Sequence, residues 1–396
     1  MKEDLSLTFF GVASEFDFEA EKKRLVDNLN WFKSMSVEEF TFYKKWEELQ
    51  DVDIPENGVT KAAIWTPKDL QNEELTIKEI QELKPKVVLV ESPAGDKTWN
   101  TLRRYSHSAE HHNTPGRFMK FLLIDENTDK ILGFTSIASE MPALRGRDEV
   151  IGIKKEVWMA KNGEGTNNHS VQCPCIASTQ PLGYNFLGGK LMASMLTTSV
   201  VRDSYFKAYQ DVLVGMTTTS LYGASSMYNG IKWWDGVGIS AGKIYLQPSP
   251  DIYDKWHEWL KKNRTEEYNE KMTQKEGVSG PVTSAKMRVI NMIFKACGIK
   301  STDYHHGYQR GCYYSCFYQN GFDFLRGEID ESKLVMKPLF QRDVQAVLDW
   351  WKPKAIKRYQ KLKQEGRLNG EKLFYNTVRG MTYEEAKKAF AGAVGR

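Results

Sequence analysis

The chain has 396 residues and a formal net charge of +4, and its residues are 41% hydrophobic, 12% aromatic and 27% charged. This composition excludes disordered and fibrous classes, and the length predicts one large domain with additions or two to three domains. No apolar run approaches the roughly 20 residues that cross a bilayer, so we expect a globular protein without a membrane partner.

The first 105 residues predict a mainly helical region. The segments "DFEAEKKRLVDNLNWFKSM" and "SVEEFTFYKKWEELQ" carry apolar residues at helical spacing. Ser36, followed by Glu38 and Glu39, suits a helix start. The segment "PKVVLVES", residues 85–92, predicts a short buried strand.

Residues 106–250 predict a domain built on a sheet. The segment "RFMKFLLIDENTDKILGFTSIAS", residues 117–139, has two apolar runs joined by a polar turn and predicts a β-hairpin. A third strand is expected at "EVIGIKKE", residues 149–156. Strands at 171–178 and 211–218, separated by an amphipathic helix, predict a parallel βαβ unit, and "GKIYLQPS" predicts a last strand.

The five cysteines favour a reducing compartment. Their number is odd, no Cys-x-x-Cys pair occurs, and the N-terminus shows no signal-peptide pattern, so a cytoplasmic protein is expected. Cys173 and Cys175 alternate in "VQCPCIAS", which predicts that both are small buried hydrophobes on one face of a strand. Their spacing is not that of zinc ligands, and we predict no metal site.

The last region, residues 251–396, is predicted to be helical, basic and aromatic. It contains "KPKAIKRYQKLKQEGR", residues 352–367, with seven Lys or Arg residues against the single acid Glu365. At helical spacing several of these cations share one face. Two interpretations stay open: a solvated surface helix, or a surface that contacts the phosphate backbone of a nucleic acid.

Six segments in this order resemble the DruA-like family, which is named after a component of the Druantia anti-phage system and includes phage and mobile-element proteins. The resemblance covers about Trp99 to Glu328. It rests on "RFMKFLLIDENTDKILGFTSIAS", "RGRDEVIGI", "NFLGGKLMASML", "VLVGMTTTSLYGASSMYNGIKWW", "GVGISAGKIYL" and "HHGYQRGCYYSCFYQNGFDFLRGE".

The resemblance implies a fold. The predicted order of strands and helices is that of the GCN5-related N-acetyltransferase (GNAT) fold, and the family core is similar to that of the phage Mom proteins, which modify adenine in DNA. We therefore expect an α+β protein with a GNAT-like mixed sheet and mainly helical N-terminal and C-terminal additions.

A GNAT-like core implies a site for acyl-CoA or a related acyl donor. Acetyltransferases hold its pyrophosphate with Q/R-x-x-G-x-G/A at a helix N-terminus. The nearest match is "QPLGYN", where Asn185 replaces the last small residue, and "NFLGGK" is a second partial match. The alternative is that Asn185 caps the helix and the glycines permit close packing. The candidate donor-binding residues are Gln180, Gly183, Asn185, Gly188, Gly189 and Lys190.

The expected catalytic residues lie on two segments. Asp148, at an expected strand entrance, is a candidate general base, and Tyr222 or Tyr228 is a candidate acid beside Ser225. The candidate substrate-binding residues are Arg147, Ser226, Asn229, His306, Arg310 and Arg326. The structural alternatives are an Arg147–Asp148 ion pair and hydroxyls that only satisfy backbone groups.

Two functions follow from these patterns. The first is an acyltransferase-like enzyme that modifies a base or nucleotide of nucleic acid, with DNA favoured, in a phage or in anti-phage defence. The second is a catalytically inactive module of the same fold that binds nucleic acid or protein in such a system. Nuclease activity has less support, because no paired-carboxylate motif followed by Lys stands out.

Overall fold

The computed structural model describes residues 16–50, 61–107, 116–160, 163–220, 227–273, 285–341, 344–370, 378 and 380–389. The chain forms two compact units. Unit 1 comprises Met1–Ser36 and Lys243–Gly307, and unit 2 comprises Val37–Gly242 and Tyr308–Arg396. The three-part division expected from the sequence, with boundaries near 105 and 250, stays a prediction.

Unit 1 is built from helices that pack through aromatic side chains. Asp17 caps the first helix by accepting hydrogen bonds from two backbone N–H groups. Phe18 packs edge-on against the buried Trp256, with ring centroids 5.2 Å apart. The helices of this unit are α1 (Phe18–Ser34), α10 (Pro250–Asn263), α11 (Thr265–Met272) and α12 (Ala285–Cys297).

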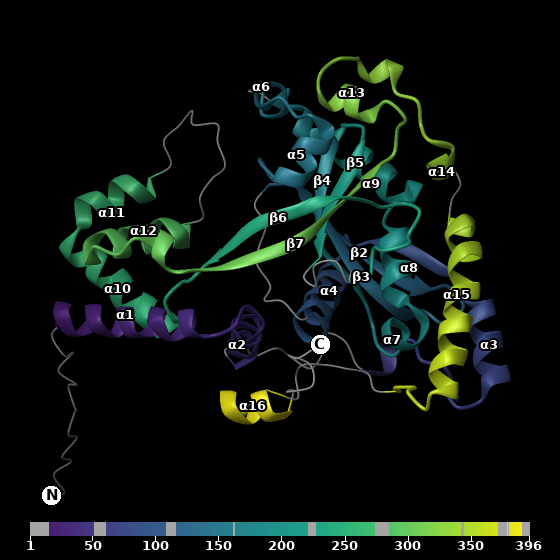
Figure 1. Cartoon of the computed structure of the whole chain (residues 1–396), viewed down its shortest axis with the longest axis horizontal. Coiled ribbons are helices and arrows are strands. Elements are labelled where there is room, and N and C mark those ends of the chain that lie inside the picture. Colours follow the sequence, from purple (N-terminus) through teal and green to yellow (C-terminus); the bar gives the residue numbers. More distant parts are fainter. Residues whose placement is uncertain are drawn as a thin grey trace, which may run out of the picture. The chain divides into compact units, whose positions relative to one another are not determined.

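A seven-stranded mixed sheet is the framework of unit 2, and its strands have the order β1-β2-β3-β4-β5-β7-β6 (Figure 1). Neighbours from β1 to β4 are antiparallel, β4 and β5 are parallel, and β5 and β7 are antiparallel. The strands are β1 (Pro85–Leu89), β2 (Phe118–Asp125), β3 (Lys130–Ser139), β4 (Ser170–Ser178), β5 (Gly215–Ser220), β6 (Asp235–Tyr245) and β7 (His305–Cys316).

The structure confirms a mixed α+β protein and several of the expected strands. The hairpin of residues 117–139 is β2 and β3, and the expected parallel pair is β4 and β5. Backbone pairing of β4 with β5 covers only Ser170–Gln172 and Gly215–Thr217, although both strands continue beyond it. The expectation of a mainly helical C-terminal region missed β7, which inserts between β5 and β6.

The expected strand at 149–156 is wrong. Residues Arg145–Ile151 form helix α5, and Lys155–Trp158 form the short helix α6. A carboxylate oxygen of Asp148 accepts the backbone N–H of Leu144, 2.8 Å away, and so closes the first turn of α5. Gly152 then ends the helix with a φ of 73°, a left-handed conformation that glycine adopts readily.

Helices cover both faces of the sheet in unit 2. One face packs against α3 (Glu73–Glu82), α8 (Gly188–Met195), α9 (Ser199–Tyr209) and α15 (Val344–Gln364). The opposite face packs against α4 (Pro93–Ser106) and α5. The other helices are α2 (Val37–Gln50), α7 (Leu182–Phe186), α13 (Gly321–Leu325), α14 (Pro338–Gln341) and α16 (Tyr383–Ala389).

The two central cysteines are buried, as expected, but not on one face. Cys173 packs in the cluster that contains α8, whereas Cys175 packs in the cluster that contains Trp99 of α4. The register of β4 against β3 shifts between Gln172 and Cys175, and this extra residue reverses the alternation. Burial raises the pKa of both thiols, that of Cys175 to about 11. Among the described residues, no helix is long and apolar enough to span a bilayer.

Candidate nucleic-acid interface

Asp148, the expected general base, and Arg147, an expected substrate-binding residue, form an ion pair in α5. The Arg147 Nε atom donates to Asp148 Oδ1 at 2.8 Å, and its Nη1 atom lies 2.7 Å from Glu140 Oε1. The side chains of Arg147 and Glu140 are completely buried, and the guanidinium lies 4.6 Å from the centroid of the Trp158 ring. The structural alternative for Arg147 therefore holds, because its guanidinium is turned into the core.

Glu140 joins this ion pair to the sheet. Its Oε2 atom accepts hydrogen bonds from the Ser170 hydroxyl at 2.8 Å and the Thr217 hydroxyl at 2.5 Å. The backbone N–H of Met141 donates to Oε1. Ser170 also lies 3.2 Å from the Tyr314 hydroxyl. Both carboxylate oxygens are thus occupied, and the network ties β3, β4, β5 and β7 to α5.

Tyr228 lies on the other face of the sheet. Its hydroxyl is 3.2 Å from that of Thr218, its side chain is 5% exposed, and burial raises the pKa of its phenol. Thr217 donates to Glu140, and the next residue, Thr218, contacts Tyr228. Since consecutive strand residues point to opposite faces, the network of Asp148 and Glu140 lies on one face of the sheet and Tyr228 on the other. The structure does not bring Asp148 and Tyr228 into one pocket. Tyr222, Ser225 and Ser226 lie outside the described residues.

The expected pyrophosphate loop is used to build the fold. Gln180 accepts the backbone N–H of Tyr184 at 2.9 Å, at the start of α7. The amide of the fully buried Asn185 exchanges two hydrogen bonds with the backbone of Asn369, at 2.6 and 3.1 Å. A Cβ on Gly183 would come within 2.7 Å of the Gln180 amide. Asn185 therefore holds the segment after α15 and is not at an anion-binding edge.

The two glycines that begin α8 allow close packing. A Cβ on Gly188 would lie 2.2 Å from Ser178 Oγ of β4, and one on Gly189 would lie 2.9 Å from Met227 Sδ. The close-packing alternative from the sequence is thus what these positions show. Lys190, in the first turn of α8, keeps a side chain that is only partly covered.

The expected substrate residues of the last motif separate. His306 belongs to unit 1, where its ring nitrogen lies 3.0 Å from the Phe32 carbonyl oxygen. Arg310 lies 4.6 Å from the Tyr308 ring and is half-buried, which lowers the pKa of its guanidinium. Arg326 pairs with Asp323 and Glu328 and donates to the Ile151 carbonyl. The three residues thus contact different segments of the chain: His306 contacts Phe32, Arg310 contacts Tyr308, and Arg326 contacts the segments around Ile151 and Asp323.

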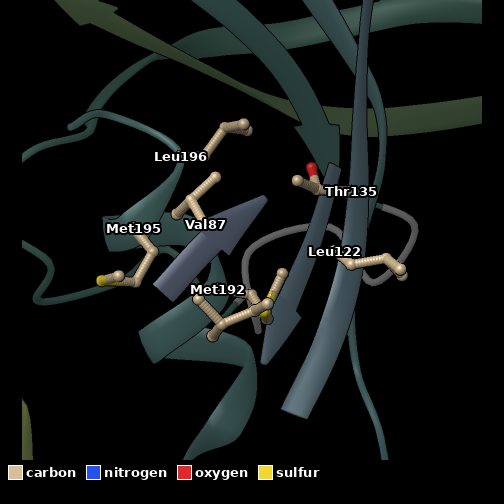
Figure 2. A pocket seen from close by; sticks show the side chains of 7 residues that line it. Val87, Leu122, Thr135, Met192, Met195 and Leu196 are labelled. Atoms are coloured by element: carbon tan, nitrogen blue, oxygen red, sulfur yellow. The ribbon is translucent and has the colours of Figure 1, made fainter. Parts of the chain in front are cut away.

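A cavity under α8 is too small for a cofactor. Figure 2 shows that its lining is almost wholly apolar and comes from α8 and from β1, β2 and β3. Its volume of about 10 Å³ is near the minimum for one water molecule. It is lined by Val87, Leu122, Leu123, Thr135, Met192, Met195 and Leu196.

The basic run does share a surface. Lys354, Lys357 and Lys361 are exposed on α15 at i, i+3 and i+7, and thus lie on one side of the helix. Helix α15 packs beside the start of α8, where the Trp351 indole N–H donates to the Leu187 carbonyl. Burial and then the charge of Lys354 lower the pKa of Lys190. We call this region the α8–α15 surface; it comprises Tyr184, Lys190, Asn229, Lys354, Lys357, Arg358, Lys361 and Arg367.

Aromatic rings and backbone groups hold several of these cations. The guanidinium of Arg358 lies 5.5 Å from the centroid of the Tyr184 ring, and Arg367 Nη2 lies 3.5 Å from its hydroxyl. Lys190 Nζ donates to the backbone carbonyl of Asn229. The only carboxylate that pairs with this surface in the described part of the chain is Glu365, which lies 3.7 Å from Lys361 and 2.8 Å from Arg367.

Helix α15 is firmly seated, so its exposed cations have a fixed spacing. The Trp351 indole N–H donates to the Leu187 carbonyl at 3.2 Å, and the Tyr359 hydroxyl donates to the Leu70 carbonyl at 2.8 Å. Both side chains are fully buried. The three exposed lysines lie on the side of α15 that this packing leaves to solvent.

Sequence reasoning missed Glu140 and Tyr184. Glu140 directly follows an apolar strand, a position where a buried carboxylate has no sequence signature apart from a nearby cation such as Arg147. Tyr184 lies within "QPLGYN" but about 170 residues before its partner Arg358, and no local pattern connects them.

The model of the protein family described as Druantia protein DruA matches residues 48–327 of the chain. The curated Druantia protein DruA of Escherichia coli (strain UMEA 4076-1) is 24% identical over 263 residues. This alignment covers 61% of the chain and 61% of that relative. No solved structure matches the chain significantly. Helix α15 follows the last residue of the family match.

Proposed function

The chain belongs to the family of Druantia protein DruA, and on that premise we propose that it acts in anti-phage defence by binding nucleic acid, with DNA favoured, through the α8–α15 surface. The observation that carries this proposal is the row of exposed Lys354, Lys357 and Lys361 on a well-packed helix. Cations in a fixed row beside Lys190 match the regular charge of a phosphate backbone.

The proposed contacts are to phosphates and therefore do not read sequence. Helix α15 presents lysines to solvent, whereas its apolar side is buried in unit 2. Base readout requires side chains that reach base edges in a groove. We therefore expect similar affinities for unrelated DNA sequences.

Salt dependence tests this function. With four phosphate contacts, from Lys190, Lys354, Lys357 and Lys361, the plot of log affinity against log salt is expected to have a slope of about −3.6 on duplex DNA. Fluorescence anisotropy of the full chain with two short duplexes of unrelated sequence measures the slope. No binding at low salt, or affinity that does not change with salt, would reject the proposal.

Acyl transfer is a second candidate function, supported by two features. The parallel strands β4 and β5 stop pairing after three residues, and α8 begins beside the end of β4 with Lys190 in its first turn. The arrangement is the one that a GNAT-like site would use for its donor, and Asp148 and Tyr228 stay proposed catalytic residues although they lie on opposite faces of the sheet. Incubation with DNA and acyl-CoA donors, followed by nucleoside mass spectrometry, tests it; an absence of any mass increase counts against it.

A further inference from the structure

We propose that Lys190 and Lys354 form a subsite for a phosphomonoester within the α8–α15 surface, and that it receives the terminal phosphate of a nucleic acid. The proposal rests on the nucleic-acid function given above. It adds a preference between two kinds of phosphate, because a chain end and a backbone linkage differ in charge.

Lys190 is held in place by its neighbours. Its Nζ atom donates to the Asn229 carbonyl. The side-chain oxygen of Asn229 accepts the hydroxyl of Tyr313, 3.1 Å away, and Tyr313 is 7% exposed on β7. One hydrogen of the ammonium is therefore used, and two remain for a ligand.

Lys354 is held from the other side. Its ammonium lies 5.4 Å from the centroid of the Trp350 ring, and Trp350 packs edge-on against the buried Trp233 at 5.3 Å. Burial and then the charge of Lys354 lower the pKa of Lys190. Lys190 is half-buried, whereas Lys354 is exposed. Lys190 contacts Asn229 and Lys354 lies over Trp350, which packs on Trp233, so both cations are anchored on the segment 229–233, and their repulsion is unfavourable.

No carboxylate of the described residues pairs with either lysine. This distinguishes the half-buried Lys190 from other lysines that are shielded from solvent. Lys44 pairs with Glu47, Lys45 with Glu48, and Lys120 with Asp96. Those pairs offset the cost of covering an ammonium group. At Lys190 an anion from outside the chain would have the same effect, and Lys354 would add a second cation to it.

The charge of the subsite selects the ligand. Two ammonium groups carry a charge near +2, and a phosphomonoester carries about −1.5 to −2 at pH 7. A phosphodiester of the nucleic-acid backbone carries only a single negative charge. The closest match is therefore a terminal phosphate, and the same chemistry is offered by a free nucleoside monophosphate.

Paired oligonucleotides test the subsite. The full chain is titrated by anisotropy with one duplex that carries 5′-phosphates and with the same duplex carrying 5′-hydroxyls. We expect about fivefold tighter binding of the phosphorylated duplex, of the order of one extra ion pair. Lys190→Met and Lys354→Met should each remove most of this preference, whereas the control Lys361→Met should weaken both duplexes equally.

The outcomes separate the subsite from the proposed function. Equal affinity for both duplexes, or a preference that survives Lys190→Met and Lys354→Met, overturns the subsite and leaves nucleic-acid binding intact. Competition with adenosine monophosphate distinguishes a free nucleotide from a chain end: displacement of both duplexes alike at micromolar concentration means a nucleotide site and overturns the assignment to a nucleic-acid end. Failure to bind either duplex rejects the proposed function and this inference together.

Discussion

Replacing Arg147 with Met is expected to lower the free energy of unfolding of unit 2 by about 3–5 kcal/mol. The substitution leaves the Glu140 carboxylate fully buried and without the cation 2.7 Å away. Ser170 and Thr217 would still donate to Glu140, but neutral hydroxyls do not offset the charge. The loss is large because desolvation of an unpaired carboxylate has no compensation in the core.

Urea denaturation followed by tryptophan fluorescence measures this effect. The control is Arg145→Met, two residues earlier on the same helix, whose side chain is 72% exposed and pairs with Glu149. An exposed pair contributes at most about 1 kcal/mol. The double variant Glu140→Leu, Arg147→Met should recover part of the stability, since it removes both buried charges. Equal losses for Arg147→Met and Arg145→Met would contradict the buried network.

The same network explains why the motif around Asp148 suggests catalysis. An arginine beside an aspartate at the edge of a sheet has the residue types of a proton-transfer site, and the sequence does not reveal that the guanidinium points inward. Its first partner, Glu140, accepts hydrogen bonds from both strands of the parallel pair. We infer that the network fixes the register of β4 against β5.

Local signals made part of the fold predictable. The hairpin of β2 and β3 needs only two alternating strands and the polar turn between them, all within 23 residues. The βαβ unit is also close in sequence. By contrast, "EVIGIKKE" alternates over too few residues to distinguish a strand from a short helix. The hydrogen bond from the Leu144 N–H to Asp148 stabilises the first turn of helix α5 there. Strand β7 pairs with β5 from about 90 residues away, and such non-local pairing has no local signature.

The candidate site was also predictable only where its residues are close in sequence. The seven cations between Lys352 and Arg367 identify a basic helix from the sequence alone. That Lys354 shares a surface with Lys190, about 160 residues earlier, depends on how α15 packs beside α8, where Trp351 donates to the Leu187 carbonyl. At Asn185 the local pattern was misleading. The residue lies in a loop that resembles an anion site, but its side-chain amide forms hydrogen bonds with the backbone of Asn369.

Reversing the charges of Lys354, Lys357 and Lys361 to Glu is expected to weaken binding to every DNA sequence by about 100-fold at low salt. Each reversal exchanges an attraction for a repulsion, and about 1 kcal/mol per position gives that factor. The slope of log affinity against log salt should become less steep by about 2.7, since three phosphate contacts are lost. Anisotropy on short duplexes across a salt series measures both quantities.

The choice of residues isolates the surface from the fold. All three lysines are exposed, whereas Trp351 and Tyr359, which seat α15, are unchanged. A control variant with Lys86, Lys154 and Lys207 changed to Glu alters the net charge by the same amount on other exposed segments of unit 2. If both variants weaken binding equally, the effect comes from net charge alone. If only the α15 variant weakens binding, the phosphates lie along α15. The cations that bind them then lie C-terminal to the residues that match the family.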